Sequence, residues 1–180
     1  MCIRDSDDVE RRGGHVHSDV LRHEQTLADD EIAAALEVEV GAPVVVLDRL
    51  RHVDGEPWSL STTWMPDAVG GVTLGVDLSE RSLYRLLADH DIVATSGVRS
   101  AEATVATHEQ AQHLGVSAGS ALLRLRSVSR SADGIPIEYF VAHHRGDRSR
   151  FEFQLQQEQS HASLLHVDDD GGTSRAGTVR

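Results

Sequence analysis

The chain contains an internal repeat. Residues 20–41 (VLRHEQTLADDEIAAALEVEVG) align without gaps on residues 98–119 (VRSAEATVATHEQAQHLGVSAG), 78 positions later, and nine of the 22 aligned positions are identical. After each copy come an apolar segment and an Asp-Gly-x-Pro sequence, at 54–57 and at 133–136. Shared helix and turn residues explain part of this agreement, but the common order of the features favours a duplication. We therefore expect two units of similar structure.

Each copy predicts a strand, a short helix and a β-hairpin. Asp29-Asp30 can cap a helix in which Ile32 and Leu36 lie on one face, and Thr107 and Gln110 form a capping-box pattern in the second copy. Asp-Gly is turn chemistry, because glycine adopts positive φ without steric cost. Two such units give about six strands, mostly antiparallel, with helices on the sheet faces. The predicted fold class is α+β.

The segment between the copies predicts a further helix. In VDLSERSLYRLLADHDI, either Asp77 or Ser79 can act as the cap. One stripe of this helix would carry Leu83, Leu86, Leu87 and His90.

Length and composition indicate one folded domain with tails. Of the 180 residues, we expect 18–157 to form the domain, and 1–17 and 158–180 to be disordered because they lack apolar periodicity. No run of eighteen apolar residues and no secretory h-region are present, so the sequence predicts a cytoplasmic protein without a membrane span.

Several kinds of chemistry are disfavoured. A formal net charge of −12 argues against nucleic-acid binding by the general surface of the chain. A single cysteine, Cys2, excludes a disulfide framework. His15 and His17 have i, i+2 spacing but no HExxH sequence or cysteine partner, and the adjacent His143 and His144 would point to opposite faces of a strand, so a metal site is disfavoured. No GxSxG sequence is present. We expect no metal, no cofactor and no catalytic residues.

Two arginines in the first hairpin are the main candidate functional residues. Arg49 and Arg51 are two positions apart on an apolar strand, so their side chains leave the same face. They indicate either a solvated or ion-paired strand face, or a site for phosphate or carboxylate. The helix start at Ser79–Tyr84 could add N–H groups and hydroxyls. Glu138, in an apolar strand, is either a surface residue or an acceptor for ligand hydroxyls.

From about Ser18 to Leu155 the chain resembles the UTRA effector-binding domain of GntR-family transcription regulators of the HutC subfamily. The resemblance rests on short motifs in a specific order: Arg49-Leu50-Arg51, Asp54-Gly55-Glu56-Pro57, Trp64-Met65-Pro66, Ser82-Leu83-Tyr84, Leu114-Gly115-Val116, Gly134-Ile135-Pro136-Ile137-Glu138 and Arg145-Gly146-Asp147-Arg148. It implies a chorismate-lyase-like fold with internal duplication, in agreement with the repeat.

The resemblance also implies roles for individual residues. Arg49 and Arg51, with the helix start Ser82-Leu83-Tyr84, would hold an anion, and Glu138 would take a hydroxyl or amine. Two further positions of the implied effector site depart from the family pattern. Ser61 stands where many members have glutamate, and His144 where a tyrosine is common.

The implied function is that of a homodimeric, non-enzymatic sensor of a small anionic metabolite. Binding of the metabolite would modulate DNA binding by an N-terminal winged helix-turn-helix domain, which these 180 residues do not contain. Two alternatives stay open: an enzyme of the chorismate-lyase type, because a fold does not determine function, and a dimerisation module without a ligand. The sequence does not name the effector, the operator or the direction of regulation.

Overall fold

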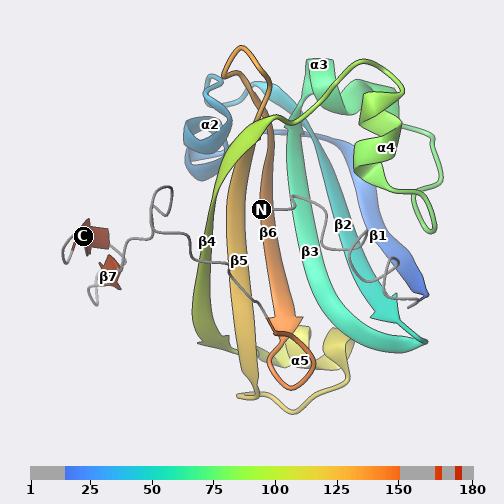
Figure 1. Cartoon of the computed structure of the whole chain (residues 1–180), viewed down its shortest axis with the longest axis vertical. Coiled ribbons are helices and arrows are strands. Elements are labelled where there is room, and N and C mark those ends of the chain that lie inside the picture. The colour runs from blue at the N-terminus through green and yellow to red at the C-terminus, as the bar shows by residue number, and fades with distance from the viewer. Residues whose placement is uncertain (1–14, 151–164, 168–172, 176–180) are drawn as a thin grey trace, which may run out of the picture. The chain divides into compact units, whose positions relative to one another are not determined.

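The computed structural model describes residues 15–150, 165–167 and 173–175. Six strands form one antiparallel sheet with the order β1-β2-β3-β6-β5-β4 (Figure 1). The strands are β1 (Val16–Leu27), β2 (Pro43–Val53), β3 (Glu56–Pro66), β4 (Ser96–Val105), β5 (Ala121–Arg130) and β6 (Pro136–Arg145). The helical segments are α2 (Asp30–Leu36), α3 (Asp67–Gly70), the 3₁₀ turn η1 (Gly71–Thr73), α4 (Leu83–Ala88) and α5 (His108–Leu114).

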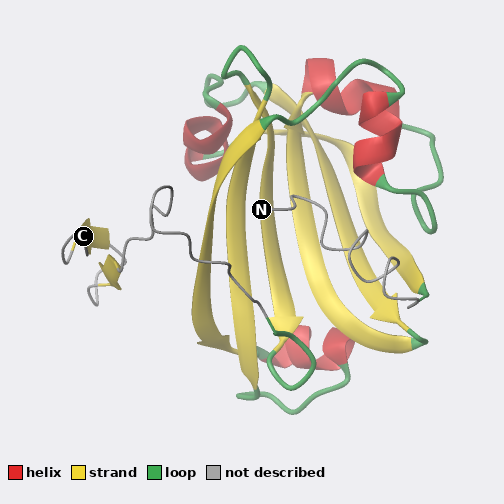
Figure 2. Cartoon of the chain, viewed as in Figure 1, coloured by secondary structure: helices red, strands yellow, loops and turns green. Residues whose placement is uncertain are grey.

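The sheet confirms the predicted α+β class and the duplicated plan. β1–α2–β2–β3 and β4–α5–β5–β6 have the same order of elements, and β3 and β6 join the two halves at the centre of the sheet. Figure 2 shows that the helices lie at the two ends of the long strands. The helices α3 and α4 and the 3₁₀ turn η1 separate the halves in sequence. The central β3–β6 pairing, with Ser59 opposite His144, is therefore a long-range contact.

The local signals of the repeat are confirmed by the structure. The Asp29 side chain accepts a hydrogen bond from the backbone N–H of Ile32 at 2.8 Å, and the Thr107–Gln110 capping box is complete in α5. At the first hairpin turn, Asp54 and Gly55 have φ values of 53° and 82°, as a tight turn between twisted strands requires.

The sheet has two different faces. We call the face that carries Val45, Leu47 and Arg49 the site face, and the face that carries Val44 and Leu50 the helix face. On the helix face, α2 packs near Val44 and α5 packs near Leu50. At one end of the site face, Val45 and Leu47 pack against the buried leucines of α4. The remainder of the site face mixes apolar residues such as Leu125 and Ala142 with several buried polar and charged residues.

One predicted helix differs from the structure. We expected Asp77 or Ser79 to cap the helix after the first repeat, but α4 starts at Leu83 with Ser82 as its N-cap. Asp77 instead accepts a hydrogen bond from the backbone N–H of Ser79 at 2.9 Å, which forms a turn before the helix. The leucine stripe is buried as expected, but His90 lies beyond the helix end and is exposed. The side chain of Asp77 thus stabilises a turn, and the helix begins later in the sequence than predicted.

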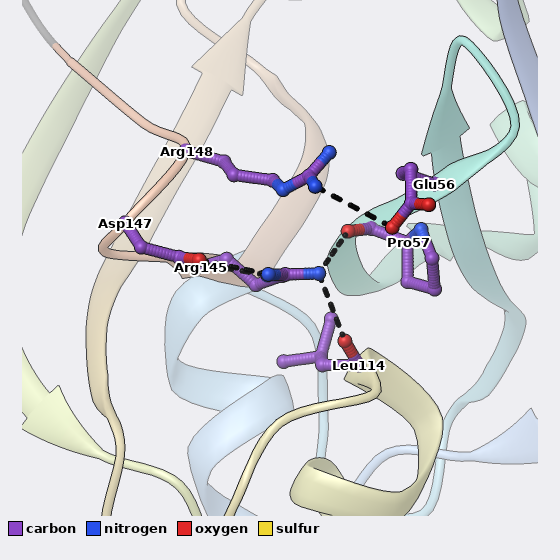
Figure 3. Close-up of polar contacts among 6 residues, drawn as sticks. All are labelled: Glu56, Pro57, Leu114, Arg145, Asp147 and Arg148. Carbon is purple, nitrogen blue, oxygen red and sulfur yellow. Dashed lines mark hydrogen bonds and ion pairs between the residues drawn. The ribbon is translucent and has the colours of Figure 1, made fainter.

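A buried arginine at the end of β6 joins both halves at one end of the sheet (Figure 3). Arg145 is 9% exposed, and its Nη1 donates to the carbonyl oxygens of Pro57 at 3.3 Å and of Leu114 at 3.4 Å. Its Nε and Nη2 donate to both carboxylate oxygens of Asp147. Because Leu114 is the last residue of α5, the guanidinium satisfies a carbonyl that the helix leaves without a partner.

After residue 150, the structure describes two short strands, β7 (Leu165–Val167) and β8 (Thr173–Arg175), which pair antiparallel. The prediction of disorder for 1–17 and 158–180 falls mainly on residues outside the described part of the chain. Strand β1 starts at Val16, two residues before the predicted domain boundary.

Candidate anion-binding site

The two arginines of the first hairpin lie on the site face, as their spacing predicted. Arg49 is 3% exposed and pairs with Ser61 across β2 and β3, while Arg51 is half-buried and pairs with Ser59. Because directly paired residues share a face, Ser59 and Ser61 line the same surface as the arginines. The solvated-face interpretation is therefore wrong for Arg49, which is buried.

Glu138 on β6 lies on the same face and is 1% exposed. Its Oε1 accepts hydrogen bonds from the Tyr84 hydroxyl and from Ser129 Oγ, the latter at 2.9 Å. This carboxyl group therefore connects α4 with β5 and β6. The surface-residue interpretation of Glu138 is wrong, because the side chain is buried and accepts a hydrogen bond from Tyr84 of the inter-repeat helix.

Burial determines the electrostatics of this cluster. Burial, and secondarily the nearby Arg51, lowers the pKa of Arg49 well below its ordinary value, while Glu138 and Tyr84 oppose that shift. Burial also raises the pKa of Glu138, against its hydrogen bonds from Tyr84 and Ser129. The pKa of Tyr84 is raised by burial and by Glu138. An anion next to Arg49 would favour its charged form and offset part of this cost.

Several buried polar atoms on the site face have no hydrogen-bond partner among the described residues. They are Arg49 Nε, Ser59 Oγ, Thr63 Oγ1 and Ser127 Oγ. Pairing places all four on one face: Thr63 is opposite Leu47 on β2, and Ser127 is opposite Phe140 next to the β3–β6 junction. Because buried polar groups are nearly always hydrogen-bonded, such a concentration indicates a place where a polar ligand or water completes the structure.

His144 and Ser61 are the two site positions that depart from the family pattern. His144 pairs with Ser59, is 2% exposed, and has its ring edge-on to Trp58 with 4.8 Å between centroids. Burial, followed by Arg51 and Arg99, lowers the pKa of His144 to about 3. A neutral imidazole and a hydroxyl therefore stand at these two positions.

The sequence reasoning missed a third arginine at this site. Arg99 on β4 pairs with Ser127, which places it on the site face, and its guanidinium lies 5.7 Å from the centroid of the Phe140 ring. It is close enough to influence the pKa of Glu138, of Tyr84 and of His144. The sequence carried no local signal for Arg99, because it is a single arginine in a segment that is not apolar, and only the order of the strands brings it to this face.

The residues at the start of α4 have different surroundings, and the anion-holding role that the resemblance implies for them stays a prediction. The Leu83 side chain is 3% exposed and packs in the apolar cluster with Val45 and Leu47, so it is a core residue. Ser82 lines an open cavity of about 700 Å³. The other lining residues are Asp77, Ser79, Glu80, Arg81, Arg85, Ala88 and Asp89, so neither the arginine pair nor Glu138 borders this cavity.

Equivalent positions of the two repeats carry different side chains at this site. Arg51 pairs with Ser59 in the first hairpin, and Ser129 pairs with Glu138 in the second. Thus the arginines of β2 correspond to serines of β5, while Ser59 of β3 corresponds to Glu138 of β6. Two halves with one fold therefore supply a cationic and a carboxylate side to one polar surface at their junction.

These features define an α+β domain with a cluster of buried polar residues on one face of its sheet. The UTRA domain model matches residues 11–150, and the chain belongs to the UTRA domain family.

The relatives are transcriptional regulators. The chain is 31% identical over 135 residues to the HTH-type transcriptional regulator GmuR of Bacillus subtilis, covering 74% of this chain and 56% of the relative. It is 34% identical over 125 residues to the HTH-type transcriptional repressor PhnF of Mycolicibacterium smegmatis, covering 69% and 51%. The chain therefore spans about half the length of these regulators.

The fold also matches a solved effector domain. The crystal structure of the effector domain of PhnF from Mycobacterium smegmatis has a TM-score of 0.79 and 27% identity, over 84% of this chain and 93% of that one. Across the residues that our structure describes, no helix is long and apolar enough to cross a membrane. The same residues contain no group of three or more His, Cys, Asp or Glu side chains arranged to hold a metal ion.

Proposed function

We propose that this domain binds a small anionic metabolite on the site face, next to Arg49 and Arg51. The observation that carries the proposal is the set of buried polar atoms near the buried Arg49 guanidinium that have no hydrogen-bond partner among the described residues. Arg49, Arg51 and Arg99 lie on the site face together with the buried carboxyl group of Glu138. A phosphate or carboxylate would supply acceptors for the guanidinium groups and hydroxyls.

We further propose that occupancy of this site regulates transcription in the cytoplasm. In the longer relatives, a domain of this family belongs to HTH-type regulators. A homodimer with a DNA-binding domain at the N-terminus of each copy would respond to the ligand if the two dimer geometries differ in affinity for it. Neither this role nor the proposed site requires covalent chemistry.

The binding step is tested by calorimetric titration of the chain with inorganic phosphate, glucose 6-phosphate and malate. We expect at least one of these probes to bind, and Arg49→Met and Arg51→Met each to weaken that binding at least tenfold. Arg124→Met is the matched control, because Arg124 lies on the helix face and pairs with Glu102 at 2.6 Å. Equal losses in all three variants, or no binding of any probe, would contradict the site.

A further inference from the structure

A row of paired residues crosses the site face next to the row that contains Arg49. Direct pairing across β3, β6, β5 and β4 gives this row the residues Thr63, Phe140, Ser127 and Arg99. The Cα atoms of Thr63 and Ser127 are two strand spacings apart, which is about 10 Å. Both hydroxyl groups are buried and have no hydrogen-bond partner among the described residues. The row therefore offers one unsatisfied hydroxyl on each side of the Phe140 ring.

Arg99 reaches the middle of this row from the edge of the sheet. Its backbone is on β4, with β5 between it and β6, but its guanidinium carbon lies 5.7 Å from the centroid of the Phe140 ring on β6. A guanidinium group held over the face of an aromatic ring keeps its N–H groups in its own plane, where they can still donate hydrogen bonds. The Phe140 contact therefore holds Arg99 over the row without using its hydrogen-bond donors.

The Arg49–Arg51 pair and Arg99 approach β6 from opposite sides. In the sheet order, β2 lies on one side of β6 and β4 on the other. Burial raises the pKa of Glu138, and both Arg99 and Arg49 counteract this rise. Burial lowers the pKa of His144 to about 3, and both Arg51 and Arg99 contribute to this shift. Positive charge from both halves of the sheet therefore meets over the same strand, and an anion between the two sources would be attracted by both.

An ion pair with Glu138 is the alternative explanation for the position of Arg99. The Glu138 Oε1 atom already accepts two hydrogen bonds. Ser127 is the direct neighbour of Arg99 across β4 and β5, and its buried hydroxyl has no partner in the described part of the chain. An Arg99–Glu138 pair would leave that hydroxyl unsatisfied, whereas an acidic group of a ligand above the Phe140 row could accept hydrogen bonds from both Arg99 and Ser127. The unsatisfied hydroxyl therefore favours a ligand group at this place.

We propose that Arg99 and Ser127 form a second subsite on the site face, which binds a second acidic group of the ligand. The first acidic group is the anion next to Arg49 and Arg51, so this inference rests on the proposed function. A carboxylate or phosphate at the second subsite would accept charge-assisted hydrogen bonds from the Arg99 guanidinium group and a further bond from the Ser127 hydroxyl. The subsite therefore selects ligands with two acidic groups over ligands with one.

The ligand that these two subsites would bind is a short diacid. Ser61 lies opposite Arg49, and the Cα atoms of Ser61 and Ser127 are two strand spacings and one two-residue step apart, about 12 Å. Because side chains extend inward from both ends, the two acidic groups of the ligand would be closer together than this. Thr63 lies between the two subsites, so its hydroxyl would bind a polar group in the middle of the ligand. A phosphorylated hydroxy acid or a sugar bisphosphate has this chemistry.

Matched pairs of probes test the second subsite by calorimetric titration of the full chain. 3-Phosphoglycerate has a carboxylate where glycerol 3-phosphate has a hydroxymethyl group, and fructose 1,6-bisphosphate has one more phosphate than fructose 6-phosphate. The quantity compared is the ratio of the two dissociation constants within each pair. In the wild type we expect the diacid of at least one pair to bind at least about tenfold more tightly than its single-acid partner.

Four variants assign this ratio to its residues. Arg99→Met should reduce the ratio to below about threefold, and Ser127→Ala should reduce it in the same direction. Arg51→Met should weaken the binding of both members of a pair and keep their ratio. Arg124→Met is the control for the loss of one positive charge, because Arg124 is bound to Glu102 on the helix face, and it should keep the wild-type ratio.

The outcomes separate this inference from the proposed function. Equal affinity for both members of each pair in the wild type, or a ratio that Arg99→Met leaves unchanged, would overturn the second subsite. The proposed function still stands in that case if Arg51→Met weakens binding of the single-acid probe. Binding of no probe, or binding that Arg51→Met does not weaken, would overturn both.

Urea denaturation distinguishes a ligand-binding Ser127 from a structural one. The midpoint of Ser127→Ala should be no lower than that of the wild type, because the removed hydroxyl has no partner among the described residues. A lower midpoint would show that the hydroxyl stabilises the fold, and would overturn the assignment of Ser127 to the subsite.

Discussion

The hydroxyl of Tyr84, on α4, donates a hydrogen bond to Oε1 of Glu138, on β6. The two residues are 54 positions apart, and the bond connects the helix between the repeats with the second repeat. The same helix packs through its leucines on Val45 and Leu47 of the first repeat. The helix α4 therefore contacts both repeats, and a movement of α4 would change the surroundings of Glu138 and the packing on Val45 and Leu47 together.

The contribution of this bond is measurable with Tyr84→Phe. The variant leaves the buried Glu138 carboxyl group with Ser129 as its remaining hydrogen-bond donor among the described residues, so we expect the free energy of unfolding to fall by about 1–3 kcal/mol. Affinity for the anion that binds the wild type should also fall, because the carboxyl group is less well held.

Tyr139→Phe is the matched control for that experiment. Tyr139 donates to Glu31 at 2.6 Å, but on the helix face. We expect urea denaturation to show a loss of stability in both variants, and calorimetry to show weaker anion binding only in Tyr84→Phe. Unchanged anion affinity in Tyr84→Phe would show that Glu138 does not contact the ligand.

Arg49 and Arg145 are both buried arginines, but we expect substitution by methionine to lower the free energy of unfolding only at Arg145. Arg49 pays a desolvation cost that lowers its pKa, and its Nε has no partner in the described part of the chain. Replacing such a cation by an apolar side chain is often neutral or stabilising. We therefore expect Arg49→Met to keep or raise the free energy of unfolding while anion binding is lost.

Arg145→Met should instead destabilise the domain. Its guanidinium donates to two carbonyl groups and to Asp147, and these groups would lose their donors (Figure 3). We expect a loss of about 1–3 kcal/mol by urea denaturation, with anion affinity unchanged in the protein that remains folded. A large loss of stability in Arg49→Met would mean that this arginine is structural and not held ready for a ligand.

Much of the fold was predictable because its signals are local. Asp29, the capping box of α5 and the Asp54-Gly55 turn each act within a few residues. The repeat then predicts the same order of elements in both halves of the chain. The central pairing of β3 with β6 has no local signal. The start of α4 was mispredicted because Asp77 forms a turn with Ser79 instead of a cap.

The candidate site was predictable only in part. Arg49, Arg51 and Glu138 stood out as charged residues in apolar strands, and the structure places them on one face. Arg99 lies on an edge strand, where a charge is ordinary, so its role depends on the sheet order and not on its neighbours in sequence. The side-chain position of Leu83 in the core likewise depends on which face of α4 meets the sheet.

The buried His144 should make stability dependent on pH. Its pKa is about 3 in the folded state because of burial and nearby arginines, against about 6.5 when exposed. Between these values the unfolded state binds more protons, so the free energy of unfolding rises with pH, by up to about 1.4 kcal/mol per pH unit from this group. Glu138 acts in the opposite direction, because its raised pKa favours the folded state at lower pH.

His144→Phe isolates this effect. In the wild type, His144 should make the free energy of unfolding rise by about 2 kcal/mol from pH 5 to pH 7. We expect the His144→Phe variant to lack this rise. His90→Phe is the control, because His90 is exposed beyond α4. Urea denaturation at several pH values gives the comparison, and the same pH dependence in His144→Phe and wild type would show that this imidazole does not resist protonation.

Ser61→Glu tests which anions the site can accept. Ser61 is 2% exposed and lies opposite Arg49, so a carboxylate at this position would pair with the arginines and occupy the place proposed for a bound anion. We expect the affinity for whichever anionic probe binds the wild type to fall at least tenfold, while the fold is retained because the new charge meets an opposite one. Thr62→Glu is the control, since Thr62 is on the helix face of the same strand. Undiminished affinity in Ser61→Glu would place the anion away from this hairpin.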